Sequence, residues 1–301
     1  MDIRRLLRAV GLAGTDRPYF TQADWLWDPI PADPVLDPDS AAVGAALGTG
    51  VHVANLDEFA TTLRTVATGS DVPRHDVDFE YAGEWGDDPF GAERAPIPAG
   101  TPLPPGSDKH LAVLDERTGM TFNLWMAEPT RHGWKAGWGA LAPVDGDGRE
   151  TMGGSSTGSG LARFGAVVRA TEIADGEIPH ALFFSTDMAA RTELRYPAVK
   201  TDGCNMSGSP VTIPEGARVQ LDPSIDLAAI PGVTSFELTV GRALQRYGAY
   251  CGDNGGARMA FIFEYVPGME PYERAGADGD YYAMPHLPWD RLRVLRRFDG
   301  S

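Results

Sequence analysis

Short runs of apolar or alternating residues recur at near-regular intervals from residue 110 onward, and glycine, proline and acidic residues separate them. Runs of this length and period predict β-strands. The predicted strands cover residues 110–114, 121–127, 139–141, 181–185, 219–221 and 259–265. Residues 115–119 predict a hairpin turn between the first two, because Gly119 can adopt the positive φ that tight turns need.

Residues 234–247 follow a different period. Their apolar side chains recur at i, i+4, i+7, i+8 and i+11, which places them on one face of a helix. These side chains are Phe236, Val240, Ala243, Leu244 and Tyr247. Gly248 follows directly and is expected to end the helix. Many short strands with one packed helix predict a mainly β chain, built as a two-sheet β-sandwich or jelly roll.

The first 106 residues are patterned as an arm rather than as part of the sandwich. Prolines are frequent in 24–38 and 96–106, where they remove amide donors and fix φ. We therefore expect the first stretch to run extended and the second to be a linker or a wall strand. Trp25 and Trp27 are expected to anchor the first stretch. Short helices are predicted over 41–47 and 56–66, and a strand over 77–81. The predicted domains are therefore an N-terminal arm, 1–106, and a β-sandwich domain, 107–301.

Composition and charge narrow the classes of protein. Glycine and proline are abundant, 36 and 24 of 301 residues, which indicates many turns and argues against a helical bundle. The net charge of −16 argues against nucleic acid as a partner, since phosphate binding needs clustered cations. The chain has no apolar run long enough for a transmembrane helix, so we expect no membrane insertion. Arg8 interrupts the apolar stretch of residues 1–14, which makes a poor signal peptide.

Motifs for common cofactors are incomplete, and we expect neither a cofactor nor a metal. The glycine-rich segment 153–160 has no lysine after its last glycine, so it predicts a flexible loop or a groove wall. The aspartates of 145–148 lack the later ligands of a calcium loop and predict a turn. The histidines form no metal-binding pair, and no Gly-x-Ser-x-Gly elbow supports a serine hydrolase. Cys204 and Cys251 are interpreted as small apolar side chains rather than a bridge, although their pairing stays open.

One part of the chain carries both aromatic rings and acids, and this mixture is typical of a polysaccharide groove. The rings are Trp125, Trp134, Trp138, Tyr196 and Tyr247, and the acids are Asp115, Glu172, Glu177, Asp202 and Asp253. Sugars present apolar faces to aromatic rings and hydroxyls to charged or amide groups. The candidate ligand-binding residues are His110, Trp134, Trp138, Arg169, His180, Tyr196, Arg218 and Tyr247. If the chain is an enzyme, the candidate catalytic carboxyls are Asp115, Glu172, Asp202 and Asp253.

Three functions remain open at this point, and the placement of side chains separates them. Scattered acids that point to solvent indicate a protein that binds a glycan without cleaving it. Two carboxyl groups that face one cleft, about 5–9 Å apart, favour a glycan-cleaving enzyme, either a hydrolase or a lyase. Aromatic residues that are buried in the core or in subunit contacts indicate a purely structural assembly protein.

A series of motifs resembles an actinobacterial family of secreted-type β-jelly-roll proteins associated with polysaccharide. The motifs are DKHLAVLD (108–115), FNLW (122–125), GSGL (158–161), IPHAL (178–182), YPA (196–198), PEGAR (214–218) and RYGAYCGDNG (246–255). The resemblance spans about residues 108–289 and implies the same fold; most members have no assigned activity. Members often carry glutamate where this chain has Asn123, and an amide cannot transfer protons near neutral pH.

The chain also resembles, more loosely, minor tail proteins of phages that infect actinobacteria. This resemblance implies a virion-associated protein that contacts cell-surface polysaccharide of the host. It further implies that the N-terminal arm contacts other virion subunits, and that the chain is cytoplasmic before assembly. We therefore expect a virion location, or an extracellular one reached without a signal peptide.

Overall fold

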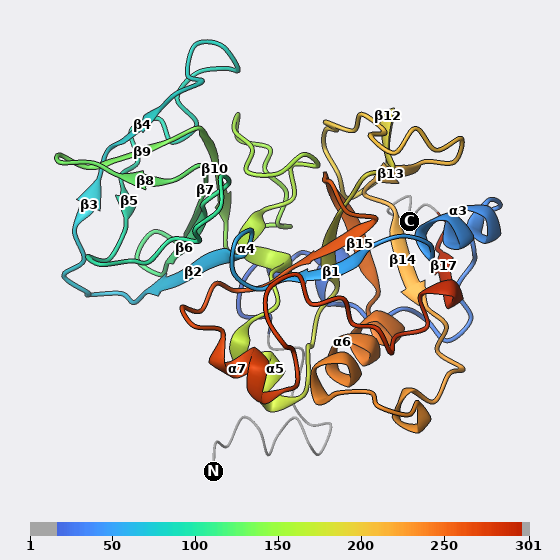
Figure 1. Cartoon of the computed structure of the whole chain (residues 1–301). Helices are drawn as coiled ribbons and strands as arrows, with labels where there is room; N and C mark the ends of the chain where they lie inside the picture. The colour runs from blue at the N-terminus through green and yellow to red at the C-terminus, as the bar shows by residue number, and fades with distance from the viewer. Residues whose placement is uncertain (1–16, 297–301) are drawn as a thin grey trace.

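The computed structural model describes residues 17–296. This part of the chain is mostly strands arranged in several sheets, which confirms the predicted mainly β class. Two large sheets lie side by side, and helices cover the larger one (Figure 1). Residues 1–14, which were interpreted as a poor signal peptide, lie outside the described residues. Within residues 17–296, no helix has the length and apolar character needed to cross a bilayer.

The larger sheet has six strands and mixes parallel with antiparallel pairs. Its order is β1 (His52–Asn55), β16 (Met259–Ile262), β11 (Leu182–Thr186), β15 (Ala249–Asn254), β14 (Arg218–Leu221) and β17 (Leu292–Val294). Successive side chains of a strand point to opposite faces. Phe184 and Phe261 therefore enter the core beneath the helices, while Phe183 and Ile262 enter a second core on the other face.

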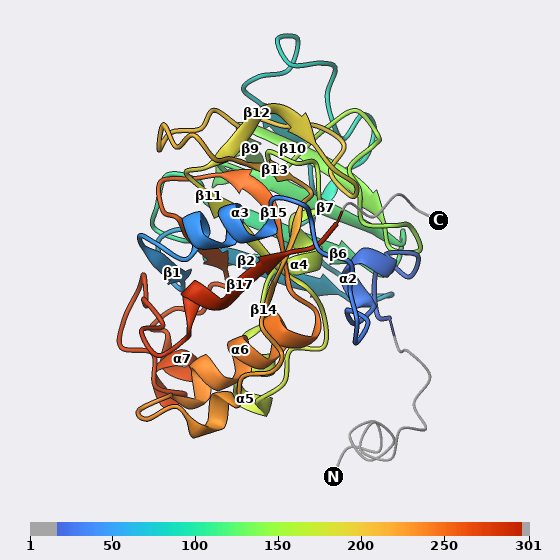
Figure 2. The ribbon, with the colours of Figure 1, turned by 90° about the vertical axis from the view of Figure 1, so that its right-hand side faces the viewer.

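Helices cover one face of this sheet, and α6 (Ser235–Arg246) is the longest of those described. Thr234 and Glu237 form a capping box at its start, and Gly248 adopts a φ of +69° just after its end, as predicted. The shorter α5 (Ala170–Asp175) and α7 (Glu270–Arg274) lie near it, and α3 (Ser40–Leu47) packs along β17 (Figure 2).

The second large sheet has four strands and curls with smaller sheets into a half-barrel. Its order is β10 (Trp138–Pro143), β7 (Met120–Trp125), β6 (His110–Asp115) and β2 (Thr61–Val66). The smaller sheets are β4 (Val77–Phe79) with β9 (Trp134–Ala136) and β8 (Glu128–Pro129), and β3 (Arg74–His75) with β5 (Ala95–Pro96). Phe79, Phe90 and Phe122 fill the enclosed core with edge-to-face ring contacts. The hairpin between β6 and β7 forms as predicted, with Gly119 at a φ of +65°.

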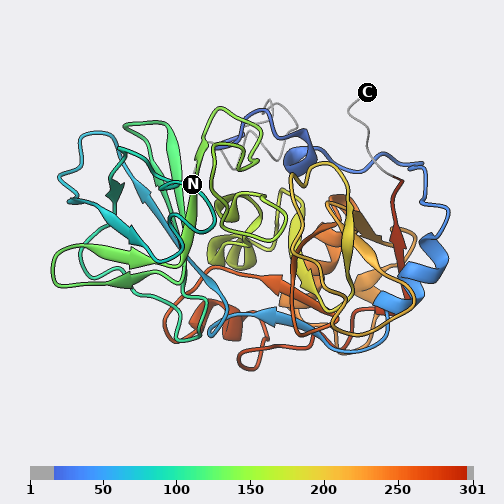
Figure 3. The same cartoon turned by 90° about the horizontal axis from the view of Figure 1, so that it is seen from above.

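Short elements complete the chain. They are α2 (Asp24–Trp27), α4 (Arg163–Ala166), β12 (Ala189–Leu194) paired with β13 (Ile213–Glu215), η1 (Leu227–Ala229) and η2 (Trp289–Arg291). Seen from above, the yellow-green segment that includes α4 lies between the two large sheets (Figure 3). This position brings the glycine-rich segment close to both sheets.

The helix predicted over residues 56–66 is wrong, because the segment splits into a turn and strand β2. The amides of Leu56 and Glu58 donate to the carboxylate of Asp280, at 2.8 and 2.9 Å, instead of entering a helix. Thr61, Thr62, Thr65 and Val66 are β-branched and favour the extended conformation. Strand β2 pairs in parallel with β6 over its whole length.

The N-terminal hundred residues contribute strands to both large sheets rather than forming only an arm. Strand β1 pairs with β16, and β2 pairs with β6, so residues 52–66 join segments beyond residue 106. Trp25 and Trp27 do act as anchors, but their contacts are to their own chain. The Trp25 indole donates to the Asp147 carbonyl at 2.7 Å, and the Trp27 ring lies edge-on to His180. The boundary at residue 106 stays a prediction.

Candidate functional site

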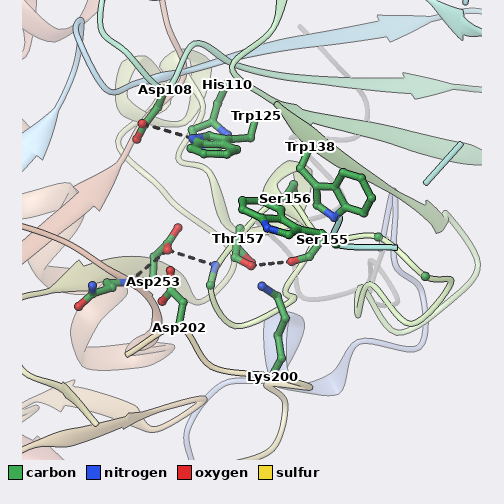
Figure 4. Close-up of a pocket in the computed structure, with 15 residues that line it drawn as sticks. Asp108, His110, Trp125, Trp138, Ser155, Ser156, Thr157, Lys200, Asp202 and Asp253 are labelled. Carbon is green, nitrogen blue, oxygen red and sulfur yellow. Dashed lines mark hydrogen bonds between the residues drawn. The ribbon is translucent and has the colours of Figure 1, made fainter. Parts of the chain in front are cut away.

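A pocket of about 570 Å³ opens between the curled sheet and the end of the larger sheet. Strands β6, β7 and β10 supply one side, and the glycine-rich loop 153–158 lies across it. The segment after β12 and the end of β15 supply the other side. Figure 4 shows Trp125 and Trp138 on one side, with Asp202, Asp253 and Lys200 on the other. The pocket thus has an aromatic wall and a charged wall.

The aromatic wall consists of Trp85, Trp125 and Trp138. Trp125 and Trp138 are cross-strand neighbours in β7 and β10, and the Trp125 indole donates to Asp108 at 3.3 Å. Trp85 comes from the loop after β4 and stacks on Tyr81, with ring centroids 4.1 Å apart. Its ring also lies nearly parallel to that of Trp125, at 6.1 Å and 15°. Because Trp85 is 52% exposed, the wall offers an accessible flat ring.

The glycine-rich loop forms a wall of this pocket. The sequence had predicted either a flexible loop or a groove wall for this segment. The amide of Gly158 donates to the Asp253 carboxylate at 3.1 Å. A Cβ at this position would collide with the carboxylates of Asp202 and Asp253, so only glycine lets the loop approach both acids. Ser155 closes the loop on itself through a hydrogen bond from its hydroxyl to the Thr157 carbonyl at 2.6 Å.

A buried arginine ties the two walls together. Arg163 of α4 donates to Asp253 at 3.1 Å and contacts the His110 imidazole at 2.7 Å. Burial and the Arg163 charge hold the pKa of His110 well below its ordinary value. His110 is therefore neutral, and its Nε2 accepts a hydrogen bond from the Arg163 guanidinium. Burial, with the nearby charge of Asp202, raises the pKa of Asp253 to about 7 despite Arg163.

Three carboxylates from separate segments converge beneath Gly158. One oxygen each from Asp202, Glu215 and Asp253 lies within 4.8 Å of the others. Asp202 is exposed, Asp253 is half-buried and Glu215 is fully buried. Burial and the neighbouring carboxylates raise the pKa of Glu215 far above its ordinary value. A set of carboxylate oxygens is the donor type that Ca²⁺ and Mg²⁺ prefer.

A fourth acid, Glu150, lies behind the glycine-rich loop. It is buried, and it accepts hydrogen bonds from the amide of Ser156, at 2.6 Å, and from the hydroxyl of Ser156. Burial raises the pKa of Glu150 to about 7, although the Ser156 hydrogen bonds oppose the shift. Glu150 thereby holds the loop that faces the pocket.

The structure brings four of the twelve predicted site residues to this pocket. They are His110, Trp138, Asp202 and Asp253. His110 and Trp138 are themselves largely buried, so their rings contribute only an edge of the wall.

Four other predicted residues hold the fold together instead. Asp115 is buried at the far end of β6, where it accepts from Arg74 and Thr118. Glu172 closes the first turn of α5, and His180 is fully buried against it at 3.2 Å. The guanidinium of Arg169 donates hydrogen bonds to the carbonyls of residues 164, 165 and 167. None of these four side chains lines the pocket.

The remaining four predicted residues are also away from the pocket. Trp134 is buried in the half-barrel core, and Tyr247 is buried at the end of α6. Arg218 donates to the carbonyls of Tyr247 and Asp28, at 2.8 and 2.9 Å. Tyr196 packs against the central core, with the Arg149 guanidinium over its ring. In each case the side chain that was expected to bind a ligand is engaged in packing or in a contact with the backbone.

Sequence reasoning missed Trp85, Arg163 and Glu215 as site residues. A signal for Trp85 was available, because residues 83–88 are a polar, glycine-containing loop in which an isolated tryptophan has no sequence-local reason to be buried. No local pattern marks Arg163 or Glu215. Cys204 and Cys251 are free thiols, which agrees with the interpretation that favoured no bridge.

No protein-family profile, no curated protein and no solved structure matches this chain. The geometry of the pocket is therefore the basis of the functional proposal that follows.

Proposed function

We propose that the chain binds a saccharide in the pocket between the two large sheets. The supporting observation is the exposed ring of Trp85, which is held parallel to Trp125 in a pocket that carboxylates and Lys200 also line. A sugar ring has an apolar face that stacks on such a ring and hydroxyls that hydrogen-bond to charged groups. A volume of about 570 Å³ accommodates a small oligosaccharide segment.

We also propose that the two large sheets form the layers of a distorted β-sandwich. Leu63 and Leu114 of the four-stranded sheet share one buried cluster with Phe183, Tyr250 and Ile262 of the six-stranded sheet. A shared core between facing sheets is the defining feature of a sandwich. The pocket then lies at one end of the two layers.

The source of the saccharide is suggested by two resemblances in the sequence, one to actinobacterial polysaccharide-associated proteins and one to phage tail proteins. We propose that the saccharide belongs to an actinobacterial envelope and that a virion carries the chain to it. Mass spectrometry of purified virions tests the location: detection of the chain supports the setting, and its absence from virions contradicts it.

Replacing Trp85 with alanine will weaken saccharide binding by about two- to tenfold, because the ring contact contributes about 0.5–1.5 kcal/mol. The probe is arabinogalactan purified from an actinobacterial cell wall, and the measurement is calorimetric titration or retention on the immobilised polymer. The half-exposed position of Trp85 lets the variant fold.

The matched control is Tyr281→Ala, which removes an exposed ring that does not line the pocket. This variant is expected to bind arabinogalactan as the wild type does. Equal affinities of the wild type and the Trp85 variant, or equal losses in both variants, would contradict the proposal.

One observation favours glycan cleavage as a second candidate function. Asp202 and Asp253 face the same pocket with oxygens within 4.8 Å, and the pKa of Asp253 is raised to about 7. Retaining glycosidases place two carboxyls about 5–5.5 Å apart, and a carboxyl that is protonated near neutral pH can act as a general acid.

If this candidate holds, the wild type will release reducing ends from arabinogalactan. Asp253→Asn will then reduce the rate by at least about 100-fold, because an amide cannot donate the proton. Glu116→Gln is the control, since that acid is exposed just after β6 and does not line this pocket. No release by the wild type would leave binding without cleavage.

A further inference from the structure

Glu215 is a buried acid whose carboxyl oxygens have no hydrogen-bond partner among the described residues. A buried ionised carboxylate without a partner is strongly unfavourable. The binding pocket does not explain it, because Glu215 does not line that pocket.

The backbone around Glu215 is fixed tightly, so the position of its side chain is built into the fold. The carbonyl of Glu215 accepts from the Arg195 amide at 2.7 Å, and the amide of Gly216 donates to the Cys251 carbonyl at 2.7 Å. Gly216 has a φ of +85°, and a Cβ there would collide with the Arg195 carbonyl. This backbone aims the carboxylate of Glu215 at those of Asp202 and Asp253.

The described residues supply one buried cation to this group of acids. Three carboxylates converge, and one cation, Arg163, pairs with Asp253 while it also serves His110. No ion pair within residues 17–296 joins Lys200 to these acids, and Figure 4 shows its amine on the side of Ser155. When all three acids are ionised, Arg163 offsets one of the three charges, and a divalent cation matches the other two.

We propose that Asp202, Glu215 and Asp253 bind a divalent cation beneath Gly158, and that Ca²⁺ is the ion that fits the donor set. Ca²⁺ takes carboxylate oxygens at about 2.3–2.6 Å, so two ligands of one ion lie at most about 5 Å apart. The three oxygens, all within 4.8 Å of one another, satisfy this limit. Glu215 offers two oxygens without donors, as a bidentate ligand requires.

The cation also contributes to saccharide binding, and this part of the inference rests on the proposed function. Asp202 is exposed and lines the pocket, so the ion lies at the pocket floor with part of its coordination shell open. Sugar hydroxyls can complete the shell of Ca²⁺, since its coordination is oxygen-rich and flexible. We infer that the cation contributes a direct contact to the bound saccharide.

The test is calorimetric titration of the full chain with CaCl₂ and, separately, MgCl₂, after treatment with chelator and dialysis. The wild type is expected to bind one Ca²⁺ and to gain thermal stability with it. Glu215→Gln and Asp202→Asn will each weaken Ca²⁺ binding by at least about tenfold, because each removes one ligand charge. The Asp202 variant keeps the test decisive even if loss of Glu215 disturbs folding, because Asp202 is exposed.

Glu193→Gln is the control, since Glu193 is an acid of β12 that is 63% exposed and lies outside the carboxylate group and the pocket. It is expected to bind Ca²⁺ like the wild type. The cation site is overturned if the wild type binds neither ion at millimolar concentration, or if the Glu215 and Asp202 variants bind as the wild type does.

A second titration, with arabinogalactan in Ca²⁺ or in chelator, separates this inference from the proposed function. Saccharide binding that weakens in chelator supports the contact between ion and sugar, and equal binding overturns it. Ca²⁺ binding with no saccharide binding overturns the proposed function and leaves the cation site standing. Glycan cleavage that persists in chelator would show that proton transfer does not need the ion, and would overturn the contact between ion and sugar.

Discussion

Replacing Arg163 with methionine will lower the free energy of unfolding by about 3–5 kcal/mol. The guanidinium is only 5% exposed and pairs with Asp253 at 3.1 Å. It also donates to His110 and lies over the Phe183 ring, at 5.2 Å from the centroid. Methionine retains much of the packing but leaves a buried carboxylate without its cation. Urea denaturation of both proteins measures the difference.

The matched control is Arg274→Met, because Arg274 also pairs with an acid but is 75% exposed. Solvent screens such a pair, so the expected loss is at most about 0.5 kcal/mol. Equal losses of stability in the two variants would show that burial does not strengthen the ion pair between Arg163 and Asp253. A lysine at position 163 is expected to fall between them, since it keeps the charge but loses the forked donor geometry.

The buried carboxyl of Glu150 will make the protein less stable as the pH rises. Its ordinary pKa of 4.5 is raised to about 7 in the folded state, mainly by burial. A raised folded pKa means that the folded state holds the proton more tightly, so the stabilising effect is complete below the ordinary pKa. It is lost as the pH rises to about 7, and the total change is about 3 kcal/mol.

Comparison of the wild type with Glu150→Gln isolates this contribution, because glutamine does not titrate. The free energy of unfolding of the wild type, relative to the variant, is expected to fall by about 3 kcal/mol between about pH 4 and about pH 8. Denaturant titrations at several pH values provide the curve. Parallel profiles for the two proteins would show that Glu150 titrates alike in the folded and unfolded chains.

The strands and the main helix were predictable because their local signals agree with their final environment. Helix α6 has an amphipathic face, a capping box at Thr234 and a stop at Gly248, and all three appear in the structure. The β6–β7 hairpin has alternating apolar residues and Gly119 in its turn. Local propensity and tertiary packing favour the same conformation in these segments.

Residues 56–66 show where local signals fail. The spacing of Leu56, Phe59 and Leu63 is compatible with a helix, but strand β6 and the carboxylate of Asp280 compete for the same backbone groups. Both partners are distant in sequence, and no local window contains them. Tertiary pairing therefore overrides the apolar spacing.

The candidate site was predictable by residue type but only partly by position. Tryptophans and acids were expected to line a groove, and Trp138, Asp202 and Asp253 do so. Composition cannot tell which ring faces the pocket, and Trp134 faces the core instead. Glu215 and Arg163 acquire their significance only from partners more than ten residues away, so sequence alone could not assign them.

The packing of β17 against α3 has a consequence for synthesis of the protein. The amide of Val294 donates to the Ser40 hydroxyl at 2.8 Å, and Leu36 bridges to Leu295. The early helix therefore lacks its covering strand until residue 295 has left the ribosome. The larger sheet cannot be completed before this strand is available, and nascent chains that lack it will expose the apolar side of α3 to chaperones.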